Sequence, residues 1–337
     1  MNPGWLHSES PFHAGEIAIQ ERLGVRSRIE AQGRRVIRDY LTEQHREFYA
    51  QLPFLIAGTV DAKDRPWASI LVGEPGFLST PDNRTLQVTT QPLFGDPLTE
   101  TLVGGADIGL LGIELSTRRR NRMNGIVTTI TPDGFAIQVG QSFGNCPQYI
   151  QARTIGRTDD VGNLTRSKPI DLSESFGKLE QSMIAAADTF FIATAFQGNE
   201  SNPIQGVDVS HRGGKPGFVR LDDNRTLTFP DFAGNLHFNT IGNLLLDPRA
   251  GLLFMDFGSC FVAPCTYRGD LLYLTGSAEV IWESDEIRAF AGAERLIRFH
   301  LSEGCRVEGS LPLRWSEPDY SPFLDRTGSW GTSRSVL

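Results

Sequence analysis

The chain repeats one twelve-residue stretch almost unchanged. "PGFLSTPDNRTL" runs from Pro75 to Leu86, and "PGFVRLDDNRTL" runs from Pro216 to Leu227, with eight of twelve positions identical and no gap. A fixed internal repeat constrains the fold strongly, because each copy should adopt the same supersecondary unit. With 337 residues, the chain is long enough for two such units.

The similarity extends beyond this stretch. "FLIAGTV" at Phe54 matches "FFIATAF" at Phe190, and "IGLLGIE" at Ile108 matches "AGLLFMD" at Ala250. In both halves, short runs rich in apolar and β-branched residues alternate with turn signals, which is typical of antiparallel strands. The sequence therefore predicts two copies of one small β-barrel unit, packed on each other as a pseudo-dimer.

The repeated stretch itself is predicted to be structural. In each copy "DNRTL" should form a hairpin turn, because Asp and Asn tolerate the left-handed backbone conformation and Thr-Leu begins the next strand. The alternative, a functional role for the motif, is the weaker interpretation.

Helical patterns precede and interrupt the strands. Apolar residues at steps of three and four predict a long helix over residues 27–52, capped by Ser27, and shorter helices near 238–248 and 283–301. The expected division of the chain is a helical segment (1–50), a first barrel repeat (51–155), a linker with a helix (156–187), a second repeat (188–300) and a C-terminal tail (301–337).

Charge and composition argue against several classes of function. The formal net charge of −8 disfavours binding to nucleic acid. No apolar run approaches the roughly 18 residues of a membrane helix, and the N-terminus lacks the pattern of a signal peptide, so no membrane partner is expected. The four cysteines show no metal-binding spacing and are predicted to be reduced thiols in the cytoplasm.

The second half resembles a known family. "NPIQGVDVSHRGG", the "DFAGN" turn and the helix ending in "LLLDPRAGLLF" follow one another as in the pyridoxamine 5′-phosphate oxidase-like proteins, which are FMN-binding split barrels. The first half, "QSFGNCPQYIQAR" and "PFHAGEIAIQERLGV" are similar to a subgroup with two barrel copies in one chain. The resemblance implies a mainly β fold with flanking helices, built as two tandem split β-barrels.

The resemblance also implies an FMN site in a groove between the barrels. The matching positions in the second half are Asp208, Ser210, His211 and Arg212 on a strand, Pro230 and Asp231 at the end of the next strand, Gly234 and Asn235 in the turn, and Asn239, Thr240 and Asn243 at the helix. A glycine-containing turn that opens a helix suits a phosphate group. We expect Arg212 and His211 to add positive charge, because the turn has no Lys or Arg and only His237 is ionisable there.

The first half is expected to cover this site. Arg119, Arg120 and Arg122 of the basic run "STRRRNR" align with a segment that reaches the partner's cofactor in the oxidases, and a solvated loop is the alternative. Asn145, Cys146, Gln148 and Tyr149 are further candidates for the flavin edge, unless Cys146 simply packs beside Tyr149. No second flavin is expected, because the first-half turn carries Asp96 and Glu100 where an anion would sit.

The implied function is that of an FMN-dependent oxidoreductase. Its partners would be a small-molecule substrate, NADH or NADPH as electron donor, and a second copy of the chain in a homodimer; the sequence assigns no catalytic residue. Two alternatives stay open. One is a non-catalytic flavin or haem carrier, with His211 or His237 as axial ligand, and the other is a scaffold without a cofactor.

Overall fold

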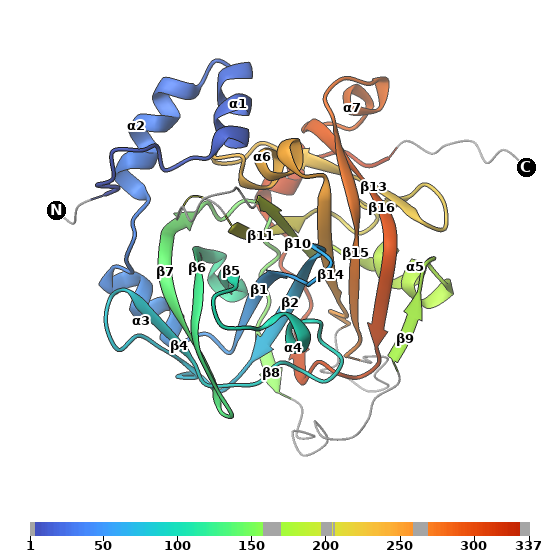
Figure 1. Cartoon of the computed structure of the whole chain (residues 1–337). Coiled ribbons are helices and arrows are strands. Elements are labelled where there is room, and N and C mark those ends of the chain that lie inside the picture. The colour runs from blue at the N-terminus through green and yellow to red at the C-terminus, as the bar shows by residue number, and fades with distance from the viewer. Residues whose placement is uncertain (1–3, 158–169, 197–203, 205, 259–268, 331–337) are drawn as a thin grey trace, which may run out of the picture.

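Two large antiparallel sheets with the same strand order make up most of the protein. The computed structural model describes residues 4–157, 170–196, 204, 206–258 and 269–330 (Figure 1). The first sheet has the order β2-β1-β5-β6-β7-β4-β3, and the second has the order β11-β10-β14-β15-β16-β13-β12, with β9 added beside β16. Because the seven strands of each sheet correspond one to one, the predicted mainly β fold with an internal duplication is confirmed.

The elements have the following bounds. The first sheet comprises β1 (Phe54–Val60), β2 (Pro66–Val72), β3 (Leu78–Ser79), β4 (Thr85–Val88), β5 (Asp107–Glu114), β6 (Arg119–Thr131) and β7 (Gly134–Asn145). The second comprises β9 (Ile170–Ser173), β10 (Thr189–Phe196), β11 (Gly206–Gly213), β12 (Arg220–Leu221), β13 (Thr226–Phe232), β14 (Arg249–Met255), β15 (Leu271–Ile281) and β16 (Ala293–Val307). A two-stranded sheet joins β8 (Ile155–Arg157) to β17 (Leu313–Trp315). The helices are α1 (Ala14–Arg22), α2 (Arg26–Val36), α3 (Glu43–Ala50), α4 (Leu98–Thr101), α5 (Lys178–Ala186), α6 (Asn239–Leu246) and α7 (Asp285–Ala289), with 3₁₀ turns at Leu115–Thr117 and Pro322–Arg326.

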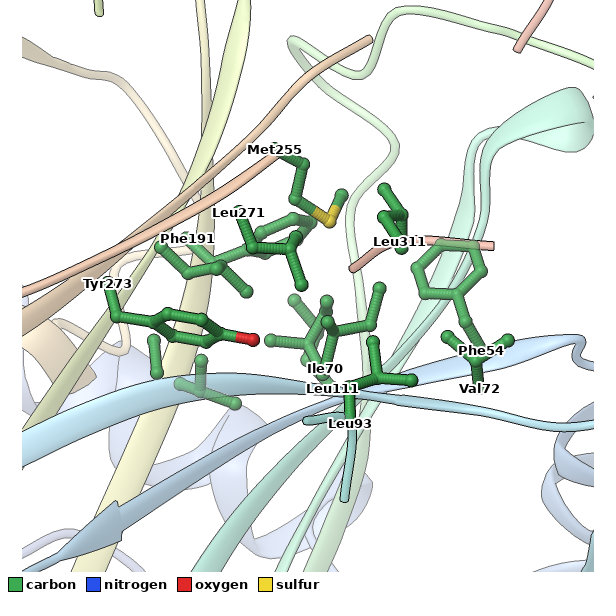
Figure 2. Close-up of a cluster of buried hydrophobic side chains, with 14 of the residues drawn as sticks. Phe54, Ile70, Val72, Leu93, Leu111, Phe191, Met255, Leu271, Tyr273 and Leu311 are labelled. Carbon is green, nitrogen blue, oxygen red and sulfur yellow. The ribbon is translucent and has the colours of Figure 1, made fainter. Parts of the chain in front are cut away.

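Each sheet has its own core, and a third core lies between the sheets. Along β1, Leu55 and Ala57 pack inside the first half, whereas Phe54 and Ile56 belong to the shared core, which also contains Phe191 of the second sheet. Figure 2 labels Phe54 and Phe191 in this core. Successive side chains of a strand point to opposite faces, so strands buried on both sides are apolar throughout. Burial of one such side chain contributes about 1.5–3 kcal/mol, so the shared core holds the two halves together firmly.

The register of the duplication corrects one predicted match. Ala57 pairs with Leu110 in the first sheet, and Ile192 pairs with Leu252 in the second, so Leu55 corresponds to Phe190. The predicted match of Phe54 with Phe190 is one residue out of register. A one-residue shift exchanges the two faces of a strand, and Phe54 lies in the shared core while Phe190 lies in the second-half core.

The "DNRTL" stretches form the predicted hairpin turns, but each turn is made by a side-chain hydrogen bond and not by a left-handed backbone. Neither Asp-Asn pair adopts a positive φ. Instead, Asp82 Oδ1 accepts a hydrogen bond from the backbone N–H of Arg84 at 2.7 Å, and Asp223 Oδ1 accepts one from Arg225 at 2.7 Å. The aspartate side chain therefore replaces the left-handed backbone as the feature that turns the chain.

Two predicted helices are wrong in extent. The long helix over 27–52 is split into α2 and α3, because the segment between them pairs with the first sheet, where Arg38 exchanges backbone hydrogen bonds with Ser142. The predicted helix at 283–301 shrinks to α7, and the rest belongs to β16. Ile297, Phe299 and Leu301 alternate into the second-half core, which is a period of two rather than 3.6.

Parts of the expected division fall inside strands. The boundary at residue 155 lies within β8, and the boundary at residue 300 lies within β16. The supposed tail is ordered as far as the description extends, since β17 pairs with β8. Cys260, Cys265 and linker residues 158–169 lie outside the described residues. No helix of the described residues is long and apolar enough to span a membrane.

Candidate functional site: a groove between the two halves

A groove opens where the first sheet meets the end of β11, the turn at 233–238 and the start of α6. It encloses a cavity of about 130 Å³. Fifteen of the seventeen residues that the sequence singles out line this groove: Arg120, Arg122, Asn145, Cys146, Gln148, Tyr149, Ser210, His211, Arg212, Pro230, Asp231, Gly234, Asn235, Asn239 and Thr240. The structure thus brings candidates from both halves together, although they are far apart in sequence.

The remaining two candidates lie behind the lining. Asp208 accepts hydrogen bonds from Arg122 Nη1 at 2.9 Å and from Asn124 Nδ2 at 2.7 Å. Asn243 donates from Nδ2 to Thr194 Oγ1 at 3.1 Å, on the inner side of α6. Both residues support the groove without facing it.

Arg122 joins the first half to α6. Its guanidinium is buried, pairs with Asp208, and donates to the Val209 carbonyl at 3.0 Å and to the Ser210 hydroxyl. Thr240 in the first turn of α6 donates to Ser210 Oγ at 3.2 Å. One polar chain therefore runs from β6 through β11 to the helix and fixes their separation.

Arg120 lies two residues before Arg122 on β6 and has different partners. Its Nε donates to the Cys146 carbonyl at 2.8 Å, and its Nη1 lies 3.4 Å from Nδ1 of His211. Among the described residues, Arg120 takes part in no ion pair. The basic run is thus part of the groove at Arg120 and Arg122, whereas Arg119 is exposed.

His211 does not supply the positive charge expected of it, and His237 is uncharged as well. Burial lowers the pKa of His211 well below 6.5, and the neighbouring guanidinium groups of Arg120, Arg212 and Arg153 lower it further. Burial also lowers the pKa of His237 to about 4. Both rings are therefore neutral at pH 7, and the Nε2 atom of His211 is buried without a hydrogen-bond partner.

The positive charge near the turn comes instead from arginines on neighbouring strands. Asp231 at the end of β13 accepts from Arg295 Nε at 2.9 Å and also pairs with Arg212 on β11. Arg295 was not among the predicted site residues, because a helix was expected for its segment. The alternation of Ile297 and Phe299 with the polar residues Arg298 and His300 was the signal that could have placed this segment on a strand.

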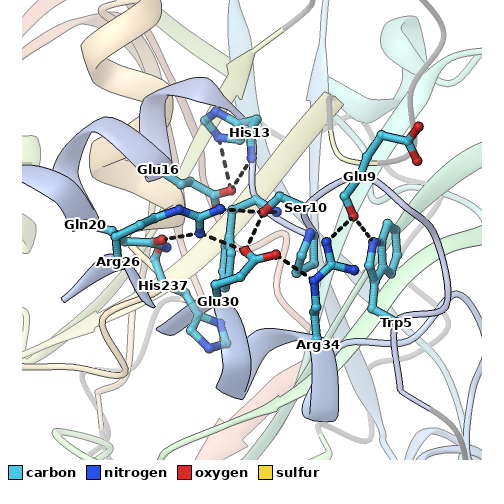
Figure 3. Close-up of polar contacts among 12 residues, drawn as sticks. Trp5, Glu9, Ser10, His13, Glu16, Gln20, Arg26, Glu30, Arg34 and His237 are labelled. Carbon is cyan, nitrogen blue, oxygen red and sulfur yellow. Dashed lines mark hydrogen bonds and ion pairs between the residues drawn. The ribbon is translucent and has the colours of Figure 1, made fainter. Parts of the chain in front are cut away.

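The turn before α6 is unusual in its backbone and is held from behind by α1. Leu236 and Phe238 have φ of 63° and 65°, a region that non-glycine residues seldom adopt. Gln20 of α1 donates from Nε2 to the His237 carbonyl at 3.4 Å. This strained turn therefore persists because a buried contact from the N-terminal segment fixes it (Figure 3).

α1 also fixes the first residue of α6. Asn239 donates to the buried carboxyl group of Glu16. The same carboxyl group accepts the backbone N–H of His13 at 2.9 Å as part of a capping box (Figure 3). The two helices approach so closely that a Cβ on Gly15 would lie 2.1 Å from the Gly242 carbonyl oxygen. Glu16 and Gln20 are site-supporting residues that the sequence analysis did not identify, although "PFHAGEIAIQERLGV" contains both.

Aromatic rings and amides close the other end of the groove. The rings of Tyr149 and Phe232 lie 4.9 Å apart, and Cys146 Sγ lies 3.6 Å from Gln148 Oε1. Asn145 Oδ1 accepts from Asn235 Nδ2 at 3.2 Å, which ties the end of β7 to the turn. Cys146 is half-buried and lines the groove. Its contact with a flavin stays a prediction.

The symmetry-related position in the first half is filled by side chains. Strand register shows that Tyr273 corresponds to Arg122 of the groove, and that Leu271 corresponds to Arg120. In the same way, Val307 corresponds to Asn145, and Ile70 corresponds to His211. These residues belong to the shared core (Figure 2).

The first-half turn is closed as well. Asp96 is buried and accepts from Tyr273 Oη at 3.0 Å, while Glu100 is exposed. A Cβ on Gly95 would lie 2.7 Å from the Val307 side chain, so the turn has no free space. The two halves therefore share one groove among the described residues of the duplication.

Comparison with known proteins finds partial structural likenesses. No family model and no curated protein matches the sequence. HupZ from Group A Streptococcus is 13% identical with a TM-score of 0.28, over 37% of this chain and 89% of its own. A FAD-binding protein from Mesorhizobium loti is 11% identical with a TM-score of 0.26, over 41% of this chain and 97% of its own. A proposed pyridoxamine 5′-phosphate oxidase from Corynebacterium glutamicum is 10% identical with a TM-score of 0.28, over 42% of this chain and 100% of its own.

Proposed function

We propose that the groove binds FMN and that the protein is a flavin-dependent oxidoreductase. The observation that carries the proposal is the convergence of both halves on one groove that combines arginines, amides, a helix N-terminus and aromatic rings. A flavin mononucleotide has a phosphate, a hydroxylated chain and a planar ring, so it needs these elements together in one elongated site.

The residues present fit this group. Arg122 Nε, Arg212 Nε, Asn145 Nδ2 and His211 Nε2 are buried polar atoms that have no hydrogen-bond partner in the protein. Buried polar groups are nearly always paired, so such a cluster indicates a ligand that satisfies them. Most of these atoms are N–H donors, which suits the oxygens of a phosphate, of hydroxyl groups and of ring carbonyls.

The phosphate would be held at the α6 end. Asn235, Asn239 and Thr240 surround the first turn of this helix, whose free backbone N–H groups and dipole favour an anion. Arg122, which pairs with Asp208, connects to that turn through the hydroxyl groups of Ser210 and Thr240. Tyr149 and Phe232 offer an apolar surface to the ring at the opposite end.

The protein would orient the cofactor and exclude water from it. When bound, FMN supplies hydride or single-electron transfer, which no side chain of the groove provides. A small-molecule substrate would approach from the open side of the groove, and NADH and NADPH are the electron donors to test. Because His211 is neutral, it would hydrogen-bond with the cofactor or substrate without adding charge.

The test is an absorption spectrum followed by an FMN titration. We expect flavin bands when FMN is added, a stoichiometry of one FMN per chain, and a rise in melting temperature, since a ligand that binds only the native state stabilises it. Thr240→Val removes one hydroxyl hydrogen bond and should weaken FMN binding about two- to tenfold.

Thr99→Val in α4 is the matched control, because Thr99 lies near the start of the first-half helix on an exposed surface. Its FMN affinity should equal that of the wild type. A haem band instead of flavin bands would favour the carrier alternative. A colourless protein whose melting temperature does not respond to FMN would rule out the proposal and leave the scaffold.

A further inference from the structure

Arg120 is the one arginine of the groove lining that lacks an acidic partner among the described residues. The other three, Arg122, Arg212 and Arg295, each pair with a buried aspartate. Arg120 contacts only a carbonyl, a thiol and an imidazole. Arg120 is half-buried, and partial removal of a cation from water without a counter-charge is unfavourable. An anion that pairs with Arg120 would therefore not have to compete with an aspartate of the protein.

His211, which lies beside Arg120, has one ring nitrogen without a hydrogen-bond partner. His211 is 6% exposed, and its Nε2 atom has no hydrogen-bond partner, although the residue lines the groove. The positive charges of Arg122 and Arg212 add to that of Arg120, and together with burial they lower the pKa of the Arg120 guanidinium. A cation and an imidazole whose Nε2 atom lacks a partner thus lie side by side at one end of the groove.

This end is separate from the end assigned to the phosphate. Arg120 and Arg122 are two residues apart on β6, which corresponds to about 7 Å along a strand. Arg122 connects through Ser210 to Thr240 in α6, whereas Arg120 connects to Cys146. An anion at α6 would therefore leave Arg120 without a counter-charge.

We propose that Arg120 and His211 bind the anionic group of the substrate, a carboxylate or phosphate oxyanion, beside the flavin. The inference rests on the proposed function, because it assumes that FMN occupies the rest of the groove. The guanidinium offers two parallel N–H groups to an oxyanion, and His211 adds a third contact through Nε2. The substrates of this protein are therefore acidic small molecules.

The experiment titrates FMN-loaded protein with acetate and, separately, with inorganic phosphate at constant ionic strength in chloride. The readouts are the flavin absorbance spectrum and the melting temperature, and ultrafiltration checks that FMN stays bound. We expect a saturable response to at least one anion, and the anion that responds identifies the class of oxyanion. Arg120→Gln should weaken that response at least tenfold while changing the Kd for FMN less than threefold, and Arg120→Lys should retain part of it.

Arg119→Gln is the matched control. This neighbour is exposed, its guanidinium lies over the Phe48 ring at 5.1 Å, and its loss removes the same charge from outside the groove. Its anion response should equal that of the wild type. The inference is overturned if neither anion gives a saturable response, if Arg119→Gln and Arg120→Gln weaken it equally, or if phosphate acts only by displacing FMN.

Two further outcomes separate this inference from the proposed function. If Arg120→Gln abolishes FMN binding, Arg120 holds the cofactor, which overturns the inference and leaves the proposed function intact. If the wild-type protein binds no FMN, the proposed function fails, and the inference fails with it.

Discussion

Asp96 and Tyr273 provide the sharpest test of the electrostatics in the shared core. Asp96 is buried, and burial raises the pKa of its carboxyl group from 3.8 to about 6. Its Oδ1 accepts from the Leu98 backbone N–H at 2.8 Å, and its Oδ2 accepts from the Ile70 N–H at 3.2 Å and from Tyr273 Oη at 3.0 Å. Tyr273 lies on the second sheet, so this bond crosses between the halves.

The raised pKa fixes the sign of the pH dependence. The native state holds the Asp96 proton more tightly than the unfolded chain, so the contribution is fully present below pH 4 and is lost as the pH rises through about 6. A difference of about two pKa units corresponds to about 3 kcal/mol. Above pH 6 the carboxylate is ionised, and the bond from Tyr273 becomes charge-assisted.

Tyr273→Phe should therefore cost more stability at pH 7.5 than at pH 5. Removal of a hydrogen bond to a charged group costs about 1.5–3 kcal/mol, and removal of a neutral one costs about 0.5–1.5 kcal/mol. Tyr49→Phe is the control, because Tyr49 is equally buried and donates to a neutral carbonyl of Asn121 at 3.1 Å. Its cost should be about 0.5–1.5 kcal/mol at both pH values.

Urea unfolding at pH 5 and pH 7.5 measures the free energy of unfolding of both variants. The comparison requires that the variants and the wild type have equal m-values. The reasoning is refuted if the cost of Tyr273→Phe is the same at both pH values, or if it is no larger than that of Tyr49→Phe at pH 7.5. An extra cost of about 1 kcal/mol at pH 7.5 means that the variant raises the Asp96 pKa by about 0.7 units.

Two further substitutions test packing and burial. Gly112→Ala should cost about 1–3 kcal/mol in unfolding free energy, because its Cβ would lie 2.8 Å from a Tyr49 ring carbon, whereas Gly104→Ala, with no atom within 4 Å, should stay within about 0.5 kcal/mol. Asp188→Asn should cost about 3–5 kcal/mol, because it leaves the buried Arg153 guanidinium, 2.6 Å away, without its counter-charge. Asp319→Asn, which breaks an exposed pair with Arg118, should cost less than about 1 kcal/mol. If Gly112→Ala and Gly104→Ala have equal effects, or if Asp188→Asn and Asp319→Asn do, the burial described for these positions is contradicted.

The duplicated fold could be predicted from the sequence because local patterns and the repeat agree. The hairpin motif recurs at a constant offset, and the short apolar runs are typical of strands buried on both faces. The register could not be predicted, because "FLIAGTV" and "FFIATAF" are apolar at nearly every position, so a shift of one residue at Phe54 is invisible in composition. The helix expected over 283–301 was wrong because Arg and Glu are good helix formers, and this preference was given more weight than the period-two pattern that accompanies pairing of β16 on both sides.

The groove residues could be named from the resemblance, but their charge states could not. His211 counts as a potential cation in the sequence, and its neutrality follows from burial and from three nearby arginines, one on its own strand and two from other segments. Arg295 and Glu16 approach the groove only through sheet pairing and helix packing. Motif spacing carries no information about such contacts, because they depend on the tertiary arrangement of both halves.

The contrast between the two turns explains why one groove is open and its counterpart is closed. In the first half, the Asp96 carboxylate takes up two backbone N–H groups and the Tyr273 hydroxyl, so the protein supplies its own anion at that position. In the second half, Asn235 occupies the corresponding turn, and Arg122 replaces Tyr273. Asn235 is an uncharged amide and supplies no such anion to the second-half turn. This difference between the two turns therefore supports the proposal that the second-half groove binds an anionic ligand.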